Sequence, residues 1–196
     1  MTDEKLLIDR AQRGDKEAFR ELVERSKITT YRLAYDLTGN RHDAEDLSQE
    51  AYIRAYRGLT GFRTEAKWNS WLYRITMNTF YDHWRARSRR KLEYSDDLEQ
   101  HNTMMTDSLQ RTEESPEKKA EAGMIQKHID HALQCLSPQE RSVFVLRHYH
   151  DLPIKQIAET LEIAEGTVKS HLFRAIKRLQ KELVFYRPEL GLGEQS

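Results

Sequence analysis

Residues 152–179 read LPIKQIAETLEIAEGTVKSHLFRAIKRL, and their apolar spacing predicts two short helices joined by a tight turn at residues 162–164. The first helix turns one apolar face inward, formed by Ile154, Ile157, Ala158 and Leu161. The second helix returns to the same core with Val168, Leu172 and Ile176 at every fourth position and Leu179 three residues further on. This arrangement is typical of a helix-turn-helix.

The opposite face of the second helix carries short polar groups near its start and a basic residue beyond them: Thr167, Lys169, Ser170, His171 and Arg174. Such side chains at the N-terminal end of a helix are suited to reading base edges in the major groove of duplex DNA. The alternative is a pair of amphipathic helices that only pack together. The small residue Ala158, the three-residue turn and the run EGTVKSH at 165–171 favour the DNA-reading motif.

Upstream of this motif, helical spacing of apolar residues predicts further helices and no strands. Residues 1–91 predict one all-helical domain, in which Asp15 caps a helix, Gly39-Asn40 ends it and Asp43 restarts the next. Residues 122–187 predict a second helical domain, with a capped helix start at Ser137-Pro138-Gln139-Glu140. The predicted fold class is therefore all-α, with two small helical domains and a tail at 188–196.

The segment between the two domains, residues 92–121, is polar, acidic and nearly free of aromatic residues. It cannot bury enough apolar area to offset the entropy lost on ordering, so we expect an extended, flexible linker. Charge follows the same division although the whole chain has a net charge of +0. Residues 62–91 carry +6, residues 92–117 carry −7 and residues 165–187 carry +4. The two basic blocks and the acidic block are therefore expected to meet different partners.

The N-terminus, the apolar runs and the cysteine content of the 196-residue sequence indicate where the protein is located. The acidic N-terminus does not resemble a signal peptide, and no apolar run approaches the ~18 residues that span a bilayer. Cys135 is the only cysteine, so an intrachain disulfide is excluded. We therefore expect a soluble, cytoplasmic protein that does not insert into membranes.

A block of aromatic and basic residues occupies positions 68–90 and contains three tryptophans and five arginines. Aromatic rings stack on bases and arginines contact phosphates, which is the combination that single-stranded DNA requires. Part of the block is expected to be core instead, namely Trp71, Leu72 and Ile75. Before it, the helix from Asp43 exposes an acidic, amide-bearing face that would suit a basic partner helix or an ordinary solvated surface.

Two stretches of the first half, DAEDLSQEAYIRAYRGLTGF and WLYRITMNTFYDHWRARSRR, resemble regions 2.2 and 2.3–2.4 of extracytoplasmic-function sigma factors of the sigma-70 family. The run LSPQERSVFVLRHYHDLPIKQIAETLEIAEGTVKSHLFRAIKRL resembles their region 4. The resemblance covers about residues 5–185. It implies a transcription-initiation factor with three partners: core RNA polymerase, promoter DNA and an anti-sigma factor.

The resemblance also implies three groups of site residues. Contacts to core polymerase fall on Asp46, Gln49, Glu50 and Tyr52. Capture of the melted −10 element falls on Phe62 and Asn78, with Arg74 nearby, and the basic block itself adds Arg85 and Arg87 to this group. Contacts to the −35 duplex fall on Thr167, Lys169, Ser170, His171, Phe173 and Arg174. Many relatives have arginine at positions 169 and 171, so the −35 preference is expected to differ, because lysine does not read guanine bidentately.

Two other function classes fit parts of the sequence. A LuxR-like regulator that binds duplex DNA on its own would share the helix-turn-helix but leaves the aromatic-basic block unexplained. A metal-dependent nuclease would need clustered carboxylates, for which only the acidic residues at 43–50 are candidates. His128, His131 and Cys135 share a helical face but lack a fourth zinc ligand. We expect no catalytic residue, no metal and no cofactor.

Overall fold

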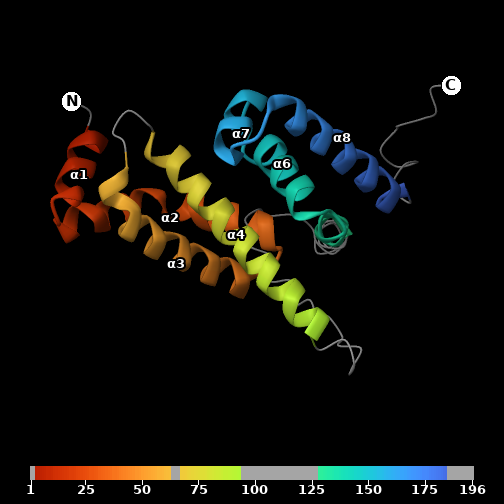
Figure 1. The fold of residues 1–196 in the computed structure, drawn as a ribbon, viewed down its shortest axis with the longest axis horizontal. Helices are drawn as coiled ribbons and strands as arrows, with labels where there is room; N and C mark the ends of the chain where they lie inside the picture. Colours follow the sequence, from red (N-terminus) through yellow and green to blue (C-terminus); the bar gives the residue numbers. More distant parts are fainter. Residues whose placement is uncertain (1–2, 63–66, 94–127, 185–196) are drawn as a thin grey trace, which may run out of the picture. The chain divides into compact units, whose positions relative to one another are not determined.

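The computed structural model describes residues 3–62, 67–93 and 128–184, and every regular element among them is a helix (Figure 1). The chain divides into two compact units, which are described separately. The all-α prediction is thus confirmed. Most of the predicted linker and the tail at 188–196 lie outside the described residues, so the domain boundaries stay predictions. No helix of the described ranges is long and apolar enough to cross a membrane.

The first unit begins with helices α1 (Asp3–Gln12) and α2 (Lys16–Thr38), which pack against each other. Asp15 caps α2 as predicted, since its carboxylate accepts hydrogen bonds from the backbone N–H groups of Glu17 and Ala18. Gly39 ends α2 at a φ of 67°, a left-handed conformation that glycine adopts without steric cost. The backbone N–H of Gly39 donates to Tyr35 and closes the last turn.

Helices α3 (Arg41–Gly58) and α4 (Trp68–Glu93) lie alongside α2, with the short 3₁₀ helix η1 (Leu59–Gly61) after α3 (Figure 1). The prediction that a helix restarts at Asp43 was two residues late. Asn40 is the N-cap, and its side-chain oxygen accepts from the backbone N–H of Asp43 at 3.0 Å. The sequence pattern marks Asn40 only as part of the helix break, although asparagine is among the strongest N-cap residues.

The core of the first unit gathers residues from all its helices around Trp68, the largest buried side chain of the described residues. The indole N–H of Trp68 donates to the Ser26 hydroxyl at 3.4 Å, which gives this buried polar group a partner. Gln12 at the end of α1 donates to the backbone carbonyls of Leu59 and Phe62 at 3.0 and 2.9 Å. These bonds fix the turn that leads from α3 toward α4.

The second unit contains a helical segment at 128–134 and helix α6 (Pro138–His148). The predicted capping box is confirmed. The Ser137 hydroxyl accepts from the backbone N–H of Glu140, and the Glu140 carboxylate accepts from the backbone N–H of Ser137. Arg147 at the end of α6 donates to the Leu152 carbonyl at 3.1 Å and thereby braces the loop that leads to α7.

Helices α7 (Ile154–Leu161) and α8 (Glu165–Glu182) stand at the predicted positions, separated by the turn at 162–164. The buried stripe of α8 consists of Val168, Ala175 and Leu179, of which the last two join a core cluster with Leu133 and Leu136. The assignment of Ile176 to this stripe was wrong, since 36% of it is exposed. Eight residues after Val168 the α-helix has turned 80° away from the stripe, whereas seven residues bring Ala175 back to it.

Candidate nucleic-acid interface

The residues predicted to contact polymerase lie on α3, where the structure divides them between two faces. Asp46 and Gln49 are exposed, and Glu50 is about one-third exposed. Tyr52 turns inward, where its hydroxyl donates to Thr30 at 3.0 Å, and burial raises its pKa. The first three residues therefore share an exposed acidic and amide-bearing surface, and Tyr52 packs behind it.

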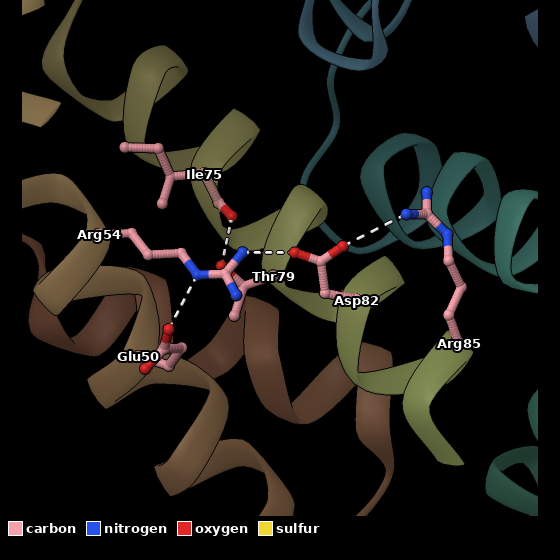
Figure 2. A network of polar contacts seen from close by, with 6 residues as sticks. All are labelled: Glu50, Arg54, Ile75, Thr79, Asp82 and Arg85. Atoms are coloured by element: carbon pink, nitrogen blue, oxygen red, sulfur yellow. Dashed lines mark hydrogen bonds and ion pairs between the residues drawn. The ribbon is translucent and has the colours of Figure 1, made fainter. Parts of the chain in front are cut away.

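Glu50 is held by a network that joins α3 to α4 (Figure 2). The Nε of Arg54 donates to the Glu50 carboxylate at 2.9 Å, and a terminal nitrogen of Arg54 donates to Asp82 at 2.6 Å. The other oxygen of Asp82 accepts from Arg85 at 3.3 Å. The hydrogen bonds that Arg54 donates to Asp82 and Glu50 raise the pKa of its guanidinium. The position of Glu50 is thus set by a cation that is itself anchored on the neighbouring helix.

Three of the residues predicted to capture the −10 element lie along one face of α4. Arg74, Asn78 and Arg85 are spaced four and seven residues apart, which places them in a row on a helix. Asn78 and Arg85 are exposed, and Arg74 is partly exposed. Arg87 points to a different side, where its guanidinium lies 3.5 Å from the Asp43 carboxylate of α3. The structure therefore brings together Arg74, Asn78 and Arg85 but not Arg87.

The aromatic residues of this region lie mainly in the core. The Phe62 ring is 4% exposed, and its centroid lies 4.8 Å from that of Trp71 and 6.1 Å from that of Trp68. The expectation that Trp71, Leu72 and Ile75 belong to the core agrees with their placement in this cluster. Trp84, by contrast, is exposed. Of the aromatic residues considered for base stacking, Trp84 is the one that α4 presents most openly.

The outer surface of α8 carries the residues predicted to contact the −35 element. Thr167, Lys169, Ser170, Phe173 and Arg174 are exposed, and His171 is partly buried. The Ser170 hydroxyl donates to the Gly166 carbonyl at 2.9 Å, which leaves its oxygen lone pairs as acceptors. The Lys177 ammonium lies 4.7 Å from the centre of the Phe173 ring, within the range of a cation–π contact.

A second side of α8 faces α6 through charged groups. The Glu140 carboxylate, 5% exposed, lies between Arg174 and Arg178, and each Nε is 3.6 Å from a different carboxylate oxygen. Arg174 also lies 3.0 Å from Nδ1 of His171. Burial and the Arg174 charge lower the pKa of His171, an effect that Glu140 partly opposes. The sequence revealed Glu140 only as a capping residue and gave no signal for Arg54 or Asp82.

Comparisons with known proteins match both units. The family model of sigma-70 region 2 covers residues 22–90, and that of sigma-70 region 4 covers residues 127–179. The chain is 34% identical to the RNA polymerase sigma-H factor of Pseudomonas aeruginosa over 90% of its length and 92% of the relative. The chain belongs to the sigma-70 family. Within it, the ECF RNA polymerase sigma factor SigW of Bacillus subtilis is also 34% identical, over 90% and 94% of the two chains.

The fold of this sigma factor has a counterpart among solved structures. The sigma factor RpoE of Bartonella quintana, solved with the anti-sigma factor NepR, matches with a TM-score of 0.65 at 22% identity. The match covers 84% of this chain and 96% of that one. Region 2 and region 4 together specify a factor that directs RNA polymerase to promoters, and they disfavour a LuxR-like regulator that binds DNA alone.

Proposed function

We propose that this sigma factor uses three surfaces, each formed by residues that the sequence singled out. Asp46, Gln49 and Glu50 on α3 bind a basic segment of core RNA polymerase. The exposed carboxylates and amide support this assignment, because complementary charge gives an interface its specificity. Tyr52 supports the surface from behind through its bond to Thr30.

The second surface is the exposed row of Arg74, Asn78 and Arg85 on α4, which captures the −10 strand once it has opened. An asparagine amide offers both a donor and an acceptor to a base edge, and flanking arginines contact phosphates. Arg87 contributes charge from the adjoining side of the helix, at the cost of its contact to Asp43. Phe62 shapes this region from the core, where its ring packs against Trp71.

The third surface is the exposed side of α8, which lies in the major groove of the −35 element. It comprises Thr167, Lys169, Ser170, His171, Phe173 and Arg174. The observation that carries the proposal is the separation of faces on α8. Its apolar stripe is buried in the unit, and the polar and basic residues stand on the remaining surface, where a groove can reach them.

Footprinting of the reconstituted holoenzyme on a promoter tests this division. Lys169→Ala should weaken protection of the −35 element alone, and Arg85→Ala should weaken protection near −10 alone. Arg20→Ala is the matched control, because Arg20 is an exposed arginine of the first unit that pairs with Glu17 on α2. A loss at −35 from Arg85→Ala, or equal losses from Arg20→Ala, would contradict the assignment.

Three further features complete the proposal. The chain acts without catalytic residues, metal or cofactor of its own, because binding energy alone drives promoter opening. A regulatory anti-sigma protein is a partner, in line with the NepR complex of the Bartonella relative. The factor works in the cytoplasm, where its polymerase partner is found and where the lone Cys135 stays reduced.

A further inference from the structure

Glu140 is a buried charge whose partners come from the DNA-facing helix. Its carboxylate is 5% exposed and already accepts a hydrogen bond from the Ser137 backbone. A buried carboxylate is costly unless cations pair with it, and Arg174 and Arg178 lie on either side of it. These contacts fix Arg174 from behind, through its Nε.

The other end of the Arg174 guanidinium determines the state of a histidine. A terminal nitrogen of Arg174 lies 3.0 Å from Nδ1 of His171. A guanidinium has donors only, so Nδ1 must be the acceptor and carries no proton. The proton of the neutral ring is then on Nε2. The second ring nitrogen therefore acts as a hydrogen-bond donor.

We propose that His171 is a specificity-determining residue of the −35 surface, that it donates from Nε2 to the N7 of a purine, and that Arg174 is the positioning residue that holds it in this tautomer. Both purines present N7 as an acceptor in the major groove, whereas cytosine presents an N4 donor there. The donor therefore rewards a purine and opposes a cytosine at one position. The proposal rests on the −35 surface described under Proposed function.

The surroundings of His171 favour the neutral ring over the protonated one. Its partial burial and the charge of Arg174 lower its pKa, and the Glu140 carboxylate opposes this shift in part. A protonated ring would have no free lone pair for Arg174 and would place two cations side by side. Arg178 offers a matched comparison, because it pairs with the same carboxylate and donates instead to the Cys135 carbonyl at 3.3 Å.

The tautomer is measured directly on the full-length chain, without DNA. Long-range ¹H–¹⁵N spectra of ¹⁵N-histidine-labelled protein distinguish protonated from unprotonated ring nitrogens, and His171→Gln identifies the signals of residue 171. Wild type and Arg178→Ala should show Nε2–H alone. Arg174→Ala should show a mixture of both tautomers. An Nδ1–H ring in the wild type, or an unchanged spectrum in Arg174→Ala, overturns the proposal.

The specificity is measured with holoenzyme on promoters in which each −35 purine is replaced in turn by its 7-deaza analogue, which lacks N7. At one position the replacement should weaken wild type and Arg178→Ala roughly 2- to 10-fold, the value of a single hydrogen bond. It should have no effect on His171→Ala, and Arg174→Ala should lose most of the penalty.

Failure of this inference can be told apart from failure of the proposed −35 surface. If every deaza analogue leaves wild-type binding unchanged while Lys169→Ala still weakens −35 protection, the surface stands and the role of His171 is overturned. If Arg174→Ala retains the full wild-type penalty, Arg174 does not act through His171. If the holoenzyme gives no −35 protection at all, the proposed surface itself is wrong, whatever tautomer the spectra show.

Discussion

Replacing Glu50 with lysine separates a role in polymerase binding from a role in folding. In the structure Glu50 accepts from Arg54, and both side chains are about one-third exposed. An exposed glutamate–arginine pair four residues apart stabilises a helix by about 0.3–0.5 kcal/mol, and a like-charge pair destabilises it by a similar amount. The substitution therefore costs about 1 kcal/mol of folding free energy. A domain with 5–15 kcal/mol of stability, a typical range, remains folded. Arg54 also keeps its second partner, Asp82.

The expected loss in binding is larger than the loss in folding. Disrupting one side of a charge pair that is buried at an interface costs about 2–5 kcal/mol, and each 1.4 kcal/mol changes affinity about tenfold. We therefore expect Glu50→Lys to weaken binding to core RNA polymerase by at least about 30-fold. Competition with a fluorescent wild-type chain measures the affinity, and circular dichroism of the free chain shows that the helices persist.

Glu21→Lys is the matched control for this experiment. Glu21 on α2 pairs with Arg25 four residues later at 2.8 Å, and Arg25 keeps a second acid, Asp3, as Arg54 keeps Asp82. The two variants thus share their charge change and their local cost. Glu21→Lys should bind core polymerase within a factor of about 2 of wild type, because surface substitutions away from special contacts change little. Unchanged affinity in Glu50→Lys, or an equal loss in both variants, would refute the assignment of this face.

Three further predictions follow from single residues. Asn78→Ala should slow the appearance of permanganate-reactive −10 thymines on duplex promoters, because opening costs ~1.4 kcal/mol per base-pair step and the captured strand must offset it. A template that is already mismatched across −10 should recover much of the run-off yield. Melting at the wild-type rate would exclude Asn78 from the capture surface. Ser137→Ala should lower the stability of the second unit by about 1 kcal/mol through loss of the helix cap. Ser142→Ala should leave that stability unchanged or raise it, because the buried Ser142 hydroxyl has no hydrogen-bond partner among the described residues. Hydrogen exchange of the α6 amides compares the two variants. Burial and the adjacent arginine lower the pKa of His171, so the unfolded state binds a proton at this residue more readily than the folded state. The free energy of unfolding should therefore fall as the pH drops through about 6.5. Denaturant melts should show a smaller fall in His171→Gln, and an equal fall would contradict the lowered pKa of His171.

Local signals in the sequence predicted much of the fold. Asp15, Gly39 and the Ser137–Glu140 box act through backbone groups within a few residues, so their roles are visible in the sequence itself. Spacing predicted α8 well but misplaced Ile176, because a count of every fourth residue drifts away from the 3.6-residue turn. Predictions from neighbouring residues are thus reliable, whereas the error of a fixed-spacing count grows with the number of helical turns.

The candidate site was harder to predict because it depends on contacts between distant segments. Aromatic and basic residues occur all around α4, so no stripe in the sequence separates the buried Trp68 from the exposed Trp84. The pairing of Glu140 with Arg174 joins residues on two helices and becomes visible only once α6 and α8 have packed. The sequence therefore offered candidate contact residues, but it did not reveal the side chains that hold them in place.

This chain acts on promoters through RNA polymerase, and run-off transcription shows whether it does so. The template is a promoter selected with the reconstituted holoenzyme, and transcription is measured with core polymerase alone, the chain alone and both together. Binding of the free chain to the same duplex is measured in parallel at physiological salt. A transcript is expected only when both are present, together with weak, salt-sensitive binding by the free chain, whose net charge is +0. Nanomolar, site-specific binding by the free chain with no transcript from the mixture would contradict a role as a sigma factor.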